Sequence, residues 1–134
     1  MNMQNRYKPM SAREEFLGRE IVDAAYKVHK TLGPGLLERV YEACFCYELA
    51  KKGIPYLRQA DLRMYYDDSL LDDTFRVDVY VDQLVICELK SVEIIHPVWP
   101  LQIVSHLKIS RHRLGYLINF NVELIKNGIR RFIN

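Results

Sequence analysis

Apolar residues recur every three or four positions through the first third of the chain, which is the pattern of amphipathic helices. Ser11 and Glu14 have the spacing of a helix capping box, and the apolar repeat runs from there to Gly33-Pro34-Gly35. A second helix is expected over about residues 36–52, because Gly53 follows where a left-handed C-terminal cap is common. The chain is therefore predicted to begin with two helices.

The middle third alternates between apolar and polar residues, as half-buried strands do. Residues 56–66 are expected to form an extended strand that ends at a turn over residues 67–69. A clean alternation from Leu71 to Asp82 predicts a second strand. Residues 84–90 are almost wholly apolar, so this third strand is expected to be central and covered on both faces.

The last third returns to a helix and then to strands. Two prolines suit the first turn of a helix over about residues 97–111, and residues 114–120 read as an apolar strand. A turn at residues 126–128 precedes a possible short strand at 129–133. The order ααβββαβ, with that possible terminal strand, predicts an α/β fold with a mixed sheet flanked by helices.

The length of 134 residues and the lack of a linker-like segment predict a single domain over residues 1–134, with residues 1–10 as a frayed lead-in. Cys44, Cys46 and Cys87 lie in apolar runs, which favours buried, reduced thiols and a cytoplasmic location. Cys44 and Cys46 are two residues apart on an expected helix and do not share a face, so a zinc site is not expected. No run of about 18 apolar residues occurs, so no membrane span is expected.

Charge is distributed unevenly behind a net value of +2. Residues 67–93 carry 2 basic and 8 acidic side chains, whereas residues 101–134 carry 6 basic and 1 acidic side chains. An acidic segment beside a basic one fits a metal site next to a phosphate-binding surface. Ordinary solvated faces explain the same counts, and the counts alone favour that explanation.

Two charged residues interrupt the apolar run of the expected central strand. Glu88 and Lys90 are two residues apart and therefore share a face of the strand. Because burying a charge is costly, such groups are normally paired or bound to a metal. Either the two side chains pair with each other, or the strand ends there, or the carboxylate belongs to a metal site.

Asp78 lies on the polar face of the preceding strand, ten residues before Glu88. A two-residue loop at Asp82-Gln83 would place Asp78 opposite Cys87, with Glu88 on the other face. A three-residue loop or a bulge would place Asp78 directly opposite Glu88. A metal site at these carboxylates therefore requires the longer loop or the bulge.

Asp78 followed by Glu88-Leu-Lys90 resembles the D…(D/E)xK signature of the PD-(D/E)xK nuclease superfamily. Gly35-Leu-Leu-Glu38-Arg-Val-Tyr41 resembles the motif that names the GxxExxY proteins, a family placed in that superfamily. Other segments resemble that family in the same order, so that the likeness spans about residues 15–133 and implies a restriction-endonuclease-like core. These segments are 75–78, 88–93, Gln102 and 117–121.

The resemblance implies roles for five residues of a catalytic site. Asp78 and Glu88, with the Leu89 carbonyl, would hold Mg²⁺ or Mn²⁺, and a metal-bound water would attack a phosphodiester. Lys90 would orient or help to deprotonate that water, or would stabilise charge on the phosphate. Glu38 would hold a metal-bound water or a second metal, although an exposed helix glutamate is the ordinary explanation. Gln102 completes the set.

The third helix adds candidates for nucleic-acid contact. Lambda-exonuclease-like members have Tyr four residues after this Gln, whereas this sequence has His106. His106 shares a helical face with Gln102 and is either a phosphate donor or a surface histidine. Trp99 either stacks on a base or is a packing residue. The basic residues near the end of this helix are candidates for backbone phosphate contacts, with solvation as the simpler account: Lys108, Arg111 and Arg113.

Two functions fit these residues. The first is a Mg²⁺- or Mn²⁺-dependent nuclease that hydrolyses phosphodiester bonds, with DNA as the expected substrate. The alternative is a catalytically silent module that keeps the nuclease fold and binds nucleic acid or a protein partner. A homodimer formed through an exposed edge strand or the basic helix is compatible with either function.

Overall fold

The computed structural model describes residues 9–134, so the lead-in expected over residues 1–10 lies outside the described residues except for its last two positions. The observed order confirms the prediction, including the short terminal strand. The elements are α1 Ala12–Leu32, α2 Glu38–Lys51, β1 Tyr56–Tyr66, β2 Ser69–Val81, β3 Val85–Lys90, α3 Val98–Ser110, β4 Leu114–Asn119, the 3-10 helix η2 Ile125–Asn127, and β5 Ile129–Ile133.

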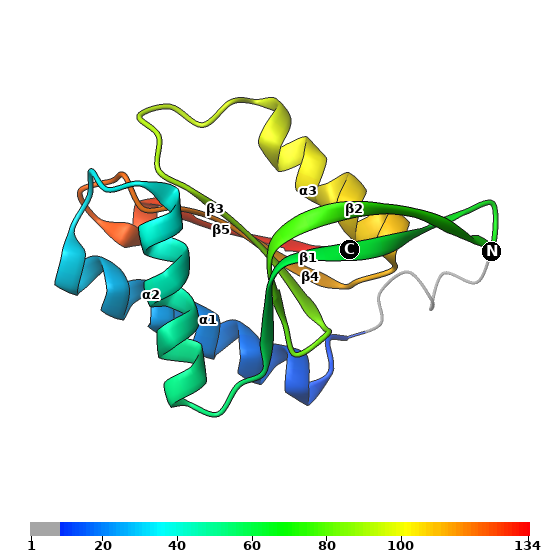
Figure 1. Cartoon of the computed structure of the whole chain (residues 1–134), viewed down its shortest axis with the longest axis horizontal. Helices are drawn as coiled ribbons and strands as arrows, with labels where there is room; N and C mark the ends of the chain where they lie inside the picture. Colours follow the sequence, from blue (N-terminus) through cyan, green and yellow to red (C-terminus); the bar gives the residue numbers. More distant parts are fainter. Residues whose placement is uncertain (1–8) are drawn as a thin grey trace.

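The five strands form one mixed sheet in the order β1-β2-β3-β4-β5. Only β3 and β4 are parallel, and α3 makes the crossover between them. The helices α1 and α2 cover one face of the sheet and α3 lies over the other, as Figure 1 shows. The central position predicted for β3 is confirmed, because three of its first four side chains are completely buried and helices flank it on both sides.

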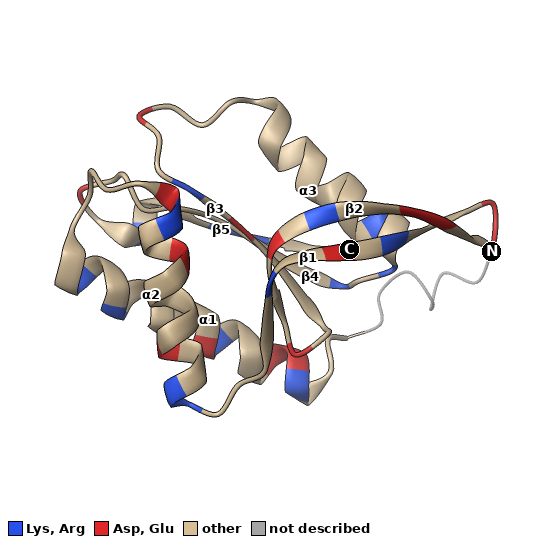
Figure 2. Cartoon of the chain, viewed as in Figure 1, with Lys and Arg blue, Asp and Glu red and all other residues tan. Residues whose placement is uncertain are grey.

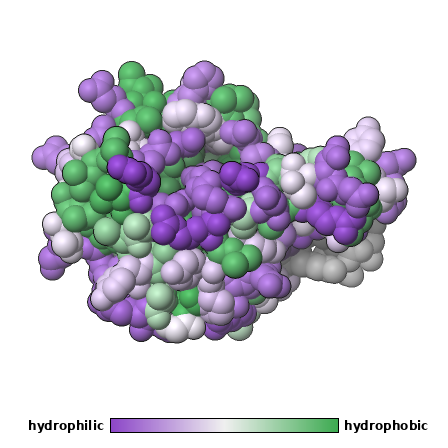
Figure 3. All heavy atoms as spheres, in the orientation of Figure 1, coloured by the Kyte–Doolittle hydropathy of each residue, from purple (hydrophilic) through white to green (hydrophobic). Residues whose placement is uncertain are grey.

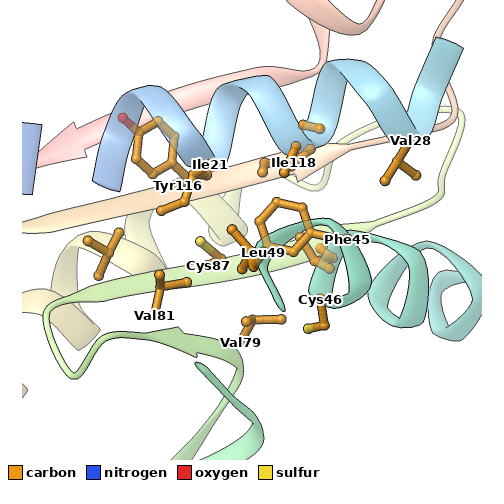
Figure 4. Close-up of a cluster of buried hydrophobic side chains, with 14 of the residues drawn as sticks. Ile21, Val28, Phe45, Cys46, Leu49, Val79, Val81, Cys87, Tyr116 and Ile118 are labelled. Carbon is orange, nitrogen blue, oxygen red and sulfur yellow. The ribbon is translucent and has the colours of Figure 1, made fainter. Parts of the chain in front are cut away.

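The larger core lies between the sheet and the pair α1 and α2 (Figure 4). Helix α1 begins with the predicted capping box, in which the Glu14 amide donates to Ser11 Oγ at 3.0 Å and the Ser11 amide donates to Glu14 Oε1 at 2.8 Å. All three cysteines are unpaired, and burial raises the pKa of the Cys46 thiol to about 12. No helix among residues 9–134 combines the length and apolar character needed to cross a membrane.

Helix α2 begins at Glu38, two residues later than expected, because the preceding loop is held by Tyr41. The Tyr41 ring is fully buried and stacks on Phe120 with 4.6 Å between ring centroids. Its hydroxyl donates to the Gly33 carbonyl at 2.6 Å and accepts from the Leu36 amide at 3.2 Å. Tyr41 is thus a packing residue, and its hydroxyl ties the loop before α2 to the first turn of that helix.

The hairpin of β1 and β2 extends beyond the body of the molecule (Figure 1). Its connection is the two-residue turn Asp67-Asp68, whose φ values of +50° and +61° are those of a turn that matches strand twist. Because Tyr66 pairs with Ser69 directly after this turn, β2 begins two residues earlier than the alternation suggested. We call this projecting hairpin the arm.

A close approach between α1 and β4 provides a test of the packing. A methyl group on Gly18 would stand 2.6 Å from the Tyr116 hydroxyl oxygen. We expect Gly18→Ala to lower the free energy of unfolding by about 1–3 kcal/mol, because a packed interface must shift to admit it. Adding Tyr116→Phe should restore part of this loss, as measured by urea unfolding with Tyr116→Phe alone as the control. A Gly18→Ala protein as stable as the wild type would contradict this packing.

Candidate active site

The connection between β2 and β3 sets the register of the proposed carboxylates. Val81 pairs with Val85 and Val79 with Cys87, so three residues, 82–84, form the loop. Continuing this register by one residue brings Asp78 opposite Glu88, although the two side chains line different pockets. The longer loop that the metal-site hypothesis required is therefore present.

The Asp78 carboxylate accepts a hydrogen bond from the β3 backbone just beyond the last paired residues of β2 and β3. The Leu89 amide donates to Asp78 Oδ2 at 2.8 Å, beyond the last paired residues, Val79 and Cys87. The N–H and C=O of one strand residue point to the same side of the strand. The Leu89 carbonyl therefore also faces Asp78, which is the direction the predicted ligand set requires.

Glu88 is a half-buried carboxyl beside a second carboxyl. Its Oε1 is buried and has no hydrogen-bond partner among the described residues. Burial, and after it the charge of Asp78, raise the pKa of Glu88 to about 9, while Lys90 acts in the opposite direction. A cation at this position would relieve both the repulsion and the unpaired oxygen.

Lys90 ends β3 and does not neutralise Glu88 directly. Its Nζ lies 4.2 Å from the centroid of the Trp99 ring, and within residues 9–134 no ion pair joins it to Glu88. An ammonium group over an indole face is a favourable cation–π arrangement. Trp99, half-buried in the first turn of α3, therefore holds the lysine that the superfamily signature places at this position.

Two small pockets lie on either side of the carboxylate pair. The α2-side pocket, of about 190 Å³, includes Glu38, Glu42, Gln59, Asp78 and Leu89 in its lining. Glu38 itself is exposed in the first turn of α2. Figure 2 shows acidic positions on the N-terminal half of α2 across from acidic positions on β2 and β3. Glu38 and Asp78 are thus brought together around one hollow.

The α3-side pocket, of about 180 Å³, joins Glu88 and Lys90 to the helix face that carries Gln102 and His106. Residues four apart share this face, as predicted. The His106 ring stacks on Phe75 at 4.3 Å, and burial lowers the pKa of its imidazole. His106 Nδ1 has no hydrogen-bond partner among the described residues.

Unlike His106, the three basic residues predicted to contact backbone phosphates line neither pocket: Lys108, Arg111 and Arg113. Arg111 lies about 18 Å from Trp99 along the helix axis, from the rise per residue. Its guanidinium is 3.5 Å from Asp68 and lies over the Tyr65 ring at 4.1 Å. Lys108 is exposed, and Arg113 is half-buried.

Sequence reasoning missed a polar network that adjoins Asp78. Glu42 is buried and accepts from Arg58 at 2.9 and 3.1 Å and from Gln59 Nε2 at 2.6 Å. The same Gln59 nitrogen lies 3.4 Å from Asp78 Oδ1. Glu42 lies one helical turn after Glu38 and shares its face of α2, so the sequence could have indicated that Glu42 lies near the same site. The φ of +50° at Gln59 had no sequence signal, because such values are rare outside glycine.

Asn119 fixes the loop that follows β3. Its Oδ1 accepts from the Val92 amide at 3.1 Å and from the Asn121 amide at 3.2 Å. Its Nδ2 donates to the Val92 carbonyl at 2.9 Å. Asn119 therefore has a structural role at the end of β4, and it holds the chain where it leaves the site towards α3.

The donor set fits a hard divalent cation. Two carboxylates and a carbonyl are oxygen ligands of the kind that Mg²⁺ and Mn²⁺ prefer. Within residues 9–134 no group of three or more His, Cys, Asp or Glu side chains is arranged to hold a metal ion. Among the described side chains, Asp78 and Glu88 would thus be two ligands and the Leu89 carbonyl a third, fewer than the six that Mg²⁺ takes.

A larger cavity lies elsewhere in the described part of the chain. It has a volume of about 730 Å³ between α1 and the strands β4 and β5, and it contains none of the predicted site residues. Its size does not bear on the carboxylate pair, because catalytic chemistry follows from the groups at a site rather than from its volume.

A family model described as the PD-(D/E)XK nuclease superfamily matches residues 15–132. This match covers most of the chain, and the chain therefore belongs to the PD-(D/E)XK nuclease superfamily. The five-stranded mixed sheet with its three helices is consistent with the restriction-endonuclease-like fold. Nucleases of this superfamily act on nucleic acids and generally use divalent metals. Comparison with curated proteins and with solved structures gave no significant match.

The raised pKa of Glu88 predicts how stability depends on pH in EDTA. The ordinary pKa of this carboxyl is 4.5, so the unfolded chain ionises it above that pH. The folded protein, in which the pKa of Glu88 is raised to about 9, keeps the proton up to about that pH. Stability contributed by Glu88 therefore falls as pH rises through this window. The glutamine of Glu88→Gln cannot ionise. We therefore expect the free energy of unfolding of this variant to exceed that of the wild type by about 1–3 kcal/mol at pH 8 and to differ little from it at pH 4.

Urea unfolding at both pH values measures this difference. Glu93→Gln, which changes an exposed glutamate on the loop after β3, is the matched control and should show no such pH dependence. A Glu88→Gln effect of equal size at both pH values would show that the carboxyl does not titrate as described.

Proposed function

We propose that this chain is a Mg²⁺- or Mn²⁺-dependent nuclease of the GxxExxY group that hydrolyses phosphodiester bonds, with DNA as its expected substrate. The observation that carries the proposal is the closeness of Asp78 and Glu88, which directly follow the last paired residues of the hairpin and act on each other electrostatically, with one oxygen of Glu88 buried and without a partner among the described residues. Such a pair is costly to maintain in a protein interior unless it serves a bound cation.

The two carboxylates and the residues next to them have different roles in this proposal. Asp78, Glu88 and the Leu89 carbonyl bind the metal ion, which supplies Lewis acidity towards water and the scissile phosphate. Asp78 is already oriented by the Leu89 amide, so little reorganisation accompanies binding. Lys90, held over Trp99, hydrogen-bonds the attacking water or a phosphate oxygen.

The remaining roles in this proposal fall to residues that line the two pockets. On the α2 side, Glu38 holds a water from its exposed position opposite Asp78. On the α3 side, Gln102 donates to the substrate strand, and the His106 Nδ1 offers a further polar atom to it. The scissile phosphate would then lie above the carboxylate pair, between the two pockets.

The metal proposal predicts separate effects for carboxylate and lysine variants. Asp78→Ala and Glu88→Ala should abolish Mn²⁺ binding measured by calorimetry, since each removes a charged ligand. Lys90→Ala should retain Mn²⁺ binding but cut nucleic acid at least about 100-fold more slowly, because it removes a group acting on the reacting atoms. Asp72→Ala, which changes a fully exposed carboxylate of the arm, is the control.

Contrary outcomes distinguish the two functions considered for this chain. Unchanged cleavage in both Asp78→Ala and Lys90→Ala would remove the proposed site. Mn²⁺ binding that depends on Asp78 and Glu88, without turnover of any DNA or RNA, would favour the catalytically silent binding module.

The network around Gln59 predicts a smaller effect on the same ion. We expect Gln59→Ala to weaken Mn²⁺ binding by about three- to tenfold, because Asp78 would lose a neighbour that restrains its carboxylate. Gln83→Ala removes an exposed glutamine in the β2–β3 loop and is the matched control. Equal Mn²⁺ affinities for the two variants would show that Gln59 does not position Asp78.

A further inference from the structure

A charge-free surface borders the α3-side pocket. Residues 94–107 contain no Asp, Glu, Lys or Arg. Three apolar side chains of this segment are open to solvent, with exposed fractions of 82% for Ile94, 48% for Val98 and 68% for Leu101. We call these three residues the apolar rim. Figure 3 shows hydrophobic surface over the part of the molecule formed by α3 and the loop before it.

Two residues of the apolar rim are sequence neighbours of residues that line the α3-side pocket. Trp99 and Gln102, three residues apart, line the pocket together with Glu88 and Lys90. Val98 and Leu101 precede these two residues by one position each, so they lie about 100° round the helix from them, and both are exposed. A ligand that extends from the pocket round the outside of α3 would therefore meet Val98 and Leu101.

The chemistry of this surface does not suit a duplex. Double-stranded DNA carries a negative charge per about 1.7 Å of its axis on its outer surface, and proteins hold it with cations. The apolar rim provides none, and the tip of the arm carries Asp67 and Asp68 near the far end of α3. Of the basic residues near that end, Arg111 already faces Asp68, and Lys108 is exposed.

An unpaired strand presents a different surface. Its bases are uncharged and expose flat faces, which stack on aromatic side chains without regard to sequence and bury apolar surface when they pack on aliphatic ones. Its phosphates require cations, and Lys90 and Arg76 line the α3-side pocket, where a phosphate would lie. The apolar rim and the pocket thus match the two parts of an unpaired nucleotide.

We propose that the substrate class is an unpaired nucleic-acid strand, whose bases rest on Ile94, Val98 and Leu101 while its phosphodiester lies over Asp78 and Glu88. This inference rests on the proposed nuclease function and specifies its substrate. Free single strands, overhangs and flaps all contain such a segment.

The test compares one labelled oligonucleotide, as DNA and as RNA, alone and annealed to its complement, at one salt concentration. With Ca²⁺ in place of Mn²⁺ to limit cleavage, the wild type should bind the single strand at least about tenfold more tightly than the duplex. The double variant Ile94→Ser/Leu101→Ser should lose about tenfold of single-strand affinity, the scale of one lost base contact. Its duplex affinity, Mn²⁺ affinity and thermal unfolding should not change.

Leu57→Ser is the matched control, because Leu57 is 55% exposed on β1 beside the β2–β3 loop and lines neither the α2-side pocket nor the α3-side pocket. Equal affinity for both forms, or a double variant that binds as the wild type does, would overturn the inference. So would a dimer that the double variant converts to a monomer in sedimentation while strand binding is unaffected, because the apolar rim would then be an interface between copies.

The same measurements separate this inference from the proposed function. Asp78-dependent cleavage of duplex and single strand at equal rates would refute the substrate class and keep the nuclease. Single-strand preference that depends on the apolar rim, without cleavage by Mn²⁺, would support the substrate class as a binding specificity and refute the nuclease.

Discussion

The register of the β2–β3 hairpin is the constraint on which the site depends. A slip of one residue would turn Asp78 away from Glu88 and separate the carboxylates. The register is locked from the opposite face, where Val79, Val81 and Cys87 pack into the core against α1 and α2 (Figure 4). A slip would expose those side chains, so the hydrophobic core that stabilises the fold also holds the two carboxylates together.

The site concentrates features that a core selected for stability alone would not keep. Glu88, which has a raised pKa and a buried oxygen without a partner among the described residues, and Gln59, a glutamine in a left-handed backbone conformation, both lie next to Asp78. Each costs free energy, and such costs gather where function requires them. The surrounding strands tolerate them because β3 is flanked by helices on both faces.

Sequence patterns were sufficient for the order of elements and for the unusual pair Glu88 and Lys90, because apolar periodicity and a charge within an apolar run are local signals. They left the hairpin register open, since two- and three-residue loops fit the same letters. Sequence patterns also did not predict which face of α3 packs on the sheet, because its apolar residues lie all round the helix. Which of them stays exposed, as Leu101 does, depends on how the helix docks on the sheet.

The distribution of charge along the chain also changes meaning once the chain is folded. The acidic segment divides between the arm and the site, and in the arm Asp72 pairs with Arg63 and Asp68 faces Arg111. The basic third is therefore partly neutralised at a distance from the pockets, rather than forming one surface beside the carboxylates. The α3 side of the site combines the apolar rim with two basic side chains, Lys90 and Arg76, that line the pocket. Under the proposal of an unpaired-strand substrate, these two cations hold the backbone while the bases contact the apolar rim.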